Sequence, residues 1–112
     1  MTITQILNTV TSLGGIGISD IRGNGKKQKL VEARAIFSIL CKDFGFRPAE
    51  TGKVINRDRT TILHYLKNYP EYIKHDEKLK LRFYKAVANI DGNINNGLQL
   101  LEKYNQKLQP NA

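Results

Sequence analysis

The chain has 112 residues, which predicts one domain with a single modest core and excludes a catalytic cleft beside a second module. Hydrophobic residues make up 40% and charged residues 25%, which excludes an intrinsically disordered chain, and no apolar run is long enough to cross a membrane. The net charge of +8 favours a polyanionic partner, although a basic surface also serves solubility alone.

The first predicted element is a helix of about three turns. It follows Thr2, a residue type that caps helices, and Gly14 and Gly15 predict its end. Its apolar positions are Ile3, Ile6, Leu7, Val10 and Leu13. The segment lacks the basic start of a signal peptide, and the single cysteine, Cys41, is typical of a reducing compartment, so we expect a cytoplasmic protein.

A glycine-rich connection spans residues 14–29 and contains five glycines. Ile16, Ile18 and Ile21 predict a short helical turn within it, and Lys26, Lys27 and Lys29 then predict a basic loop. Residues 1–70 carry 11 basic and 5 acidic side chains, net +6, whereas residues 71–112 carry 7 and 5, net +2. The basic half is therefore expected to face the partner.

Apolar residues from Leu30 to Phe44 cover most of a helix circumference, which predicts a core helix that is enclosed on most sides. These positions are Ala33, Ile36, Phe37, Ile39, Leu40, Cys41 and Phe44. Gly45 ends the helix, and we expect the cysteine thiol to be buried and inert.

Two helices joined by a tight turn follow, as in a helix-turn-helix. The first is predicted from Pro48 to Ile55, because the first helical turn tolerates proline. Asn56 breaks the pattern, and the second helix is expected to begin around Asp58 and to end at Pro70. Its inward side chains are predicted to be Ile62, Leu63, Leu66 and Tyr69.

Residues 71–90 predict one amphipathic helix that packs back on the core, with Leu81 among its apolar positions. Residues 98–108 form a last amphipathic segment that either caps the core or pairs with another protein chain. We therefore expect an all-α helical bundle, with one domain at residues 1–90 and an extension at 91–112. The last segment is too short for a convincing coiled coil, so a monomer is expected, and dimerisation through other surfaces stays open.

The start of the second helix of the helix-turn-helix carries the residues that favour nucleic-acid recognition. In this motif the N-terminal residues of the second helix meet base edges in the major groove. Arginine can contact guanine, aspartate can accept from cytosine, and threonine offers a hydroxyl and a methyl group. The candidate readers are Arg57, Asp58, Arg59, Thr60 and Thr61, with His64 and Lys67 on the outer side. The alternative is that Asp58 only caps the helix and the arginines are solvated.

The stretch from Asn56 to His64, Asn-Arg-Asp-Arg-Thr-Thr-Ile-Leu-His, resembles the signature of the C-terminal DNA-binding domain of the bacterial replication initiator DnaA. Ala33-Arg34 with the apolar residues after it resembles the long central helix of that family, and His75-Asp76 resembles its closing helix. The resemblance extends over about residues 3 to 90 and implies a Trp-repressor-like helical bundle.

That resemblance also implies a monomeric domain that binds double-stranded DNA through both grooves. It assigns the major groove to the residues from Asp58 to Thr61, and the minor groove to the basic loop of Lys26, Lys27 and Lys29. Arg34 and Lys53 match positions that contact the DNA backbone, and for Arg34 a salt bridge on the helix surface is an equally good explanation.

The sequence departs from the family pattern in three places. Arg59 stands where the family usually has histidine, which could introduce a bidentate contact with guanine. Lysines replace the minor-groove arginine, and lysine suits a narrow groove less well. The linker before the signature is shorter by about one residue, which puts the phosphate contact of Lys53 in question. The target sequence of the family should therefore not be assumed for this chain.

The residues do not favour an enzyme. No Gly-x4-Gly-Lys-Ser/Thr phosphate loop is present, and His64 and His75 lack metal-site partners, so we expect no ATPase activity, cofactor, metal ion or small-molecule substrate. The expected function is sequence-specific duplex DNA binding in the nucleoid, as a replication-origin accessory or a transcriptional regulator. Two alternatives are an adaptor that acts through a protein partner at residues 91–112 and a DNA-processing subunit that needs partners.

Overall fold

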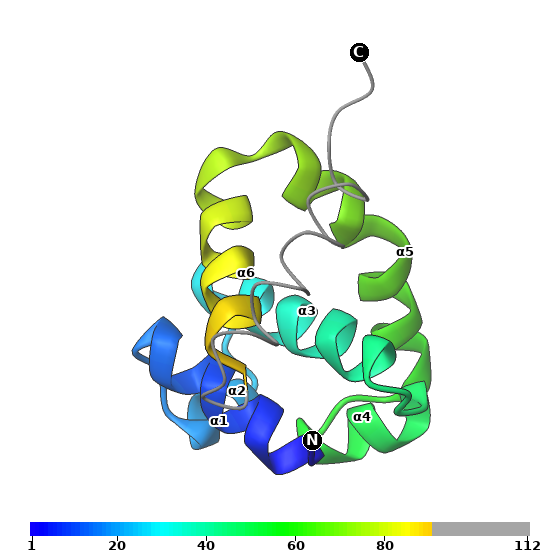
Figure 1. Ribbon diagram of the computed structural model, residues 1–112. Coiled ribbons are helices and arrows are strands. Elements are labelled where there is room, and N and C mark those ends of the chain that lie inside the picture. Colours follow the sequence, from blue (N-terminus) through cyan, green and yellow to red (C-terminus); the bar gives the residue numbers. More distant parts are fainter. Residues whose placement is uncertain (91–112) are drawn as a thin grey trace.

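The computed structural model describes residues 1–90, which contain six helices and no strand (Figure 1). The helices are α1 (Ile3–Gly14), α2 (Ile18–Arg22), α3 (Gln28–Asp43), α4 (Pro48–Val54), α5 (Arg59–His75) and α6 (Glu77–Asn89). This arrangement confirms the expected all-α class. The predicted segment at residues 98–108 lies outside the described residues.

The boundaries of α1 follow from its predicted capping residues. The backbone N–H of Gln5 donates to Thr2 Oγ1 at 3.1 Å, and the backbone N–H of Thr2 donates to Gln5 Oε1 at 2.7 Å. This reciprocal pair satisfies two backbone donors that a helix start otherwise leaves without partners. At the other end, Gly15 adopts the left-handed conformation with φ 64° and ends the helix.

Helix α3 forms the centre of the bundle, with α1 and α6 on one side and α5 on the other (Figure 1). The nine consecutive residues from Ala33 to Cys41 are all buried, which confirms the predicted core helix. Burial raises the pKa of the Cys41 thiol to about 12, so the thiol stays protonated at neutral pH and is a poor nucleophile.

Helix α5 continues through Pro70, so the prediction that Pro70 ends this helix was wrong. Proline lacks a backbone N–H and disfavours a helix interior by about 3 kcal/mol. Here Tyr69 and Ile73, on either side of the proline, are both buried in the core. Their packing holds the segment helical despite the local preference.

The predicted single helix over residues 71–90 is divided between two helices. Residues 71–75 complete α5, and Asp76 accepts a hydrogen bond from the backbone N–H of Leu79 at 3.1 Å as the N-cap of α6. Leu81 was expected on the apolar side, but 56% of it is exposed. A side-chain ion pair between Arg82 of α6 and Glu32 of α3 joins α6 to the central helix.

Candidate nucleic-acid interface

Helices α4 and α5 meet in a tight turn whose shape depends on two residues. The backbone N–H of Arg57 donates to the carbonyl oxygen of Gly52 at 2.8 Å, which brings the turn against the last part of α4. Asn56, between them, has a φ of 57° and is the one described residue other than glycine with positive φ. Asparagine tolerates this conformation better than most side chains do, which explains why Asn56 separates the two helices.

The second helix of this motif begins at Arg59, and Asp58 is its N-cap. Asp58 Oδ1 accepts a hydrogen bond from the backbone N–H of Thr61 at 2.8 Å. Hydrogen bonds from Thr61 to the charged form lower the pKa of the Asp58 carboxyl below its ordinary value. Asp58 therefore caps the helix, as considered from the sequence, and its side chain is exposed.

One exposed face of α5 starts beside this cap. Two adjacent rows of side chains form this face. Arg59 and Leu63, four residues apart, make one row, and Thr60, His64 and Lys67, at spacings of four and three, make the other. All five residues are exposed. The prediction that Leu63 points inward was wrong, because 38% of it is exposed and Tyr65 is buried in its place.

Arg34 does not lie on the polar edge of the central helix, as the sequence had suggested, because only 2% of it is exposed. Its Nε donates to the carbonyl oxygen of Ile21 at 2.8 Å, and its other nitrogens donate to Gly25, Asp20 and Gly23 at 2.7, 3.0 and 3.1 Å. These are bonds to the end of α2 and to the connection between α2 and α3, and they replace both the DNA-backbone contact and the surface salt bridge that were expected.

Arg57 was predicted in the first turn of the reading helix, but it lies in the turn before the helix, and it is half-buried. Its guanidinium donates to the carbonyl oxygens of Gly23, Asn56, Ile55 and Arg22, the last three at 3.0, 3.3 and 3.4 Å. These four protein acceptors occupy both terminal nitrogens, so a base contact is not needed to explain this arginine.

A polar hollow of about 510 Å³ lies between the α2–α3 connection and the start of α5. It is lined by Asn24, Gly25, Lys26, Val31, Arg34, Asn56, Arg57, Asp58, Thr61 and Tyr65. The structure thus brings Lys26 and Asp58 to one hollow, although 32 residues separate them in sequence (58 − 26).

The other predicted lysines lie in different surroundings. Lys27 is the exposed N-cap residue of α3, and Lys53 is exposed in the last turn of α4. The ammonium nitrogen of Lys29 lies 3.8 Å from the position that a Cβ atom on Gly15 would occupy, near the end of α1. The three lysines of the predicted basic loop therefore do not all line the hollow.

Two residues that the sequence had not singled out for DNA also belong to this region. Asn24 lines the hollow, and Arg22 connects its two sides by donating from Nε to the carbonyl oxygen of Val54 at 2.7 Å. Asn56, the first residue of the signature stretch, also lines the hollow. Nothing in the local pattern distinguished Arg22 or Asn24.

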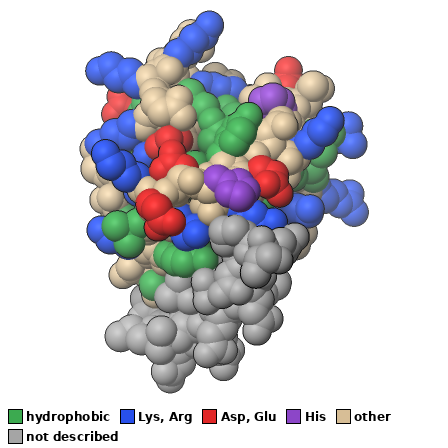
Figure 2. Space-filling model, turned by 90° about the horizontal axis from the view of Figure 1, so that it is seen from above, with side chains coloured by type: hydrophobic (Ala, Val, Ile, Leu, Met, Phe, Trp, Pro, Cys, Tyr) green, Lys and Arg blue, Asp and Glu red, His purple; other side chains and the backbone are tan. Residues whose placement is uncertain are grey.

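The opposite end of the molecule, where α5 and α6 meet, has mixed charge. Figure 2 shows acidic and histidine side chains among lysines and arginines on this end. Glu71, for example, lies 3.5 Å from the ammonium of Lys74 and 3.4 Å from the ring of His75. Such a surface is a weaker match for a polyanion than the start of α5.

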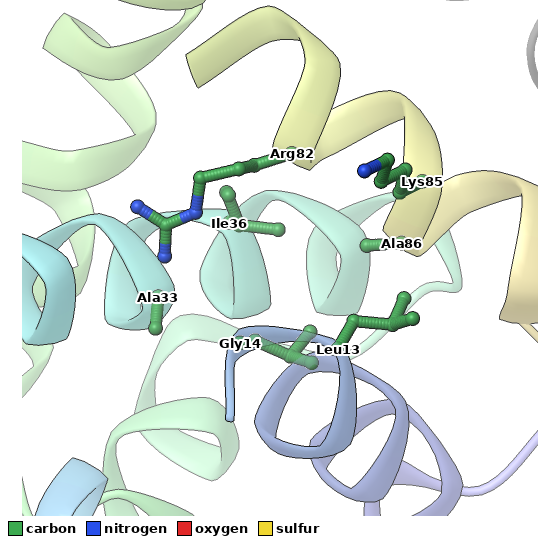
Figure 3. A pocket seen from close by; sticks show the side chains of 8 residues that line it. Leu13, Gly14, Ala33, Ile36, Arg82, Lys85 and Ala86 are labelled. Atoms are coloured by element: carbon green, nitrogen blue, oxygen red, sulfur yellow. The ribbon is translucent and has the colours of Figure 1, made fainter. Parts of the chain in front are cut away.

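A second, smaller pocket lies between α1, α3 and α6 (Figure 3). Its volume is about 90 Å³, and its lining is mainly apolar, with Arg82 and Lys85 contributed by α6. Small-molecule sites usually begin at about 300 Å³, so this pocket is small for a cofactor or substrate. Among residues 1–90, no group of three His, Cys, Asp or Glu side chains could hold a metal ion, and no helix is long and apolar enough to span a membrane.

The chain matches a known protein family. Residues 3–68, more than half of the chain, match the family model described as the bacterial DnaA protein helix-turn-helix. A search of curated proteins gave no match.

Proposed function

Because this chain belongs to the family of the bacterial DnaA helix-turn-helix, a DNA-binding fold, we propose that it reads a specific duplex sequence through α5 and the α2–α3 connection. The family match extends from α1 into α5 and so includes both elements. In a helix-turn-helix the start of the second helix enters the major groove, and here that helix is α5.

The observation that carries this proposal is the exposed face of α5. Arg59 and Thr60 stand in its first turn, followed by His64 and Lys67, and none of these four side chains is needed to fill the core. The capped N-terminus also directs free backbone N–H groups and the positive end of the helix dipole toward solvent, which favours phosphate nearby.

Within this interface we assign different tasks to different residues. Arg59 is suited to a bidentate contact with guanine, Thr60 and Thr61 to thymine, and the exposed carboxylate of Asp58 to cytosine. Lys26 extends from the hollow toward the adjacent minor groove, and Lys27, Lys53 and Lys67 contact phosphates. Arg34 is not included, because its guanidinium is buried.

In the cell, the protein acts in the nucleoid as an origin-binding accessory or a transcriptional regulator, without ATP hydrolysis. We assign DNA binding to residues 1–90 and treat residues 91–112 as an extension of this domain. A protein partner of residues 91–112 would be additional to DNA and would not replace it.

The direct test is selection of bound duplexes from a random pool, followed by affinity measurements on the selected site. The double variant Arg59→Ala, Thr60→Ala should lose at least about tenfold discrimination between the selected site and its point mutants, because each specific contact is worth about 1–3 kcal/mol. Equal discrimination by wild type and this double variant would refute the proposal.

The salt dependence of binding gives a second test with a matched control. Lys67→Ala removes a phosphate contact and should weaken binding to all sequences. The negative slope of the logarithm of the association constant against the logarithm of the salt concentration should become shallower by about 1. Lys78→Ala removes the same charge from an exposed position on α6 and should leave the slope nearly unchanged. An equal effect of the two variants would show that only total charge matters.

A further inference from the structure

The two elements assigned to DNA are bonded directly to each other. The guanidinium of Arg57, in the α4–α5 turn, donates to the carbonyl oxygens of Arg22, the last residue of α2, and of Gly23, the first residue of the α2–α3 connection. In the opposite direction, Arg22 Nε donates to the carbonyl oxygen of Val54. These bonds join residues that are 32 to 35 positions apart in sequence.

A second guanidinium holds the same connection from inside. Arg34 also donates to the carbonyl oxygen of Gly23, so this one oxygen accepts from both Arg34 and Arg57. Burial and the nearby charge of Arg57 lower the pKa of Arg34, although an arginine keeps its charge at neutral pH. The connection is therefore fixed to the central helix and to the α4–α5 turn at the same carbonyl group.

We infer that Arg57 is a positioning residue that sets the distance between the loop of Lys26 and the start of α5. This inference rests on the proposed function, and it gives Arg57 a task in DNA reading without a DNA contact. Both elements contact the same duplex, one in the minor groove and one in the major groove. Their fixed separation therefore determines how many base pairs must lie between the two parts of the binding site.

The chemistry of the side chain fits this role. A guanidinium has five N–H donors in a rigid plane and can serve several carbonyl groups at once, whereas an ammonium is a compact charge that lacks this fork. A phosphate contact, in contrast, needs mainly the positive charge. The substitution Arg57→Lys therefore distinguishes a positioning role from a phosphate contact, since it keeps the positive charge and loses the planar set of N–H donors.

The experiment compares two versions of the selected duplex, one with a single base pair inserted between the parts read in the two grooves. Methylation interference in the minor and the major groove defines these parts. The insertion displaces one part by about 3.4 Å along the axis. Wild type should lose at least about tenfold in affinity, and Arg57→Ala should lose less than about threefold, from a lower starting affinity.

Arg57→Lys should lose as little affinity on insertion as Arg57→Ala does. Lys78→Ala should lose as much affinity on insertion as wild type. Arg22→Ala removes a different bond across the same junction and should give the same tolerance if Arg57→Ala fails to fold. The inference is overturned if the alanine variants lose affinity equally for both duplexes, or if Arg57→Lys restores the wild-type penalty.

A measurement without DNA separates this inference from the proposed function. The backbone amide of Gly23, which donates to the carbonyl oxygen of Asp20 at 3.3 Å, should exchange hydrogen at least about tenfold faster in Arg57→Ala than in wild type, while amides of α1 and α6 keep their protection. Unchanged exchange at Gly23 would overturn the inference even if wild type binds DNA. Failure of wild type to bind any duplex would instead refute the proposed function.

Discussion

The carbonyl oxygen of Arg57 lies only 2.3 Å from the position that a Cβ atom on Gly52 would occupy. Real Cβ atoms do not approach backbone oxygens this closely, so the turn of the helix-turn-helix requires glycine at position 52. The space of one methyl group thus decides whether α4 and the start of α5 can meet as they do.

Gly52→Ala should therefore destabilise the protein by about 3 kcal/mol, since an added methyl group forces the backbone of the turn to shift. Urea denaturation followed by circular dichroism measures the change. Gly14→Ala is the matched control, because its added methyl would meet its nearest neighbour at an ordinary 3.7 Å, and it should leave the midpoint nearly unchanged. Equal effects of the two substitutions would contradict this account of the turn.

Asp58→Asn should change the pH dependence of stability. The pKa of Asp58 is lower in the folded protein, so its contribution is complete above the unfolded value of about 4 and is lost as the pH falls through the folded pKa. The free energy of unfolding of wild type should exceed that of Asp58→Asn at pH 6 by more than it does at pH 2.5. A difference that does not change with pH would argue against the charged cap.

Arg34→Met should destabilise the protein on the order of 3 kcal/mol, because it removes four hydrogen bonds from a charged donor group to backbone carbonyls. Arg47→Met removes an exposed arginine and should change stability by less than about 0.5 kcal/mol. Thermal denaturation of the two variants distinguishes a structural arginine from one that serves DNA. Wild-type stability in Arg34→Met, together with weaker DNA binding, would reverse our assignment.

Pro70→Ala should stabilise the protein by about 1–3 kcal/mol, because alanine restores a backbone donor in the interior of α5 and removes the steric clash of the ring. The urea midpoint measures the gain, and DNA affinity should stay at the wild-type value. Lys67→Ala, an exposed change in the same helix, provides the control for alanine itself. A less stable Pro70→Ala would mean that the half-buried ring contributes more to packing than it costs the helix.

Much of the fold could be predicted because local signals and tertiary packing agree. Thr2 and Gly15 mark the ends of α1, and the apolar run in α3 indicates a helix surrounded by others. The predicted helix end at Pro70 was wrong because a proline costs a helix about 3 kcal/mol, which is less than the free energy gained by burying Tyr69 and Ile73.

The candidate site was predicted less completely. The exposed positions from Asp58 to Thr60 follow from the signature, since a reading helix must expose its first turn. The role of Arg34 could not be read from sequence, because its four acceptors lie 9 to 14 residues away on α2 and the connection after it, whose shape exists only in the folded protein. Leu63 was wrongly preferred to Tyr65, two positions later, because hydrophobicity alone favours leucine. Tyr65 lies three residues after Ile62 and shares its buried side of the helix, whereas Leu63 lies outside it.

The unbroken burial of residues 33–41 also bears on how proteins of this kind can diverge. Almost every substitution at residues 33–41 would disturb the core, so changes should be rare in this part of α3. The outer face of α5 contributes little to the core and is free to vary. Related proteins could thus come to bind different DNA through a few substitutions on this surface without loss of stability, and Arg59 occupies such a position.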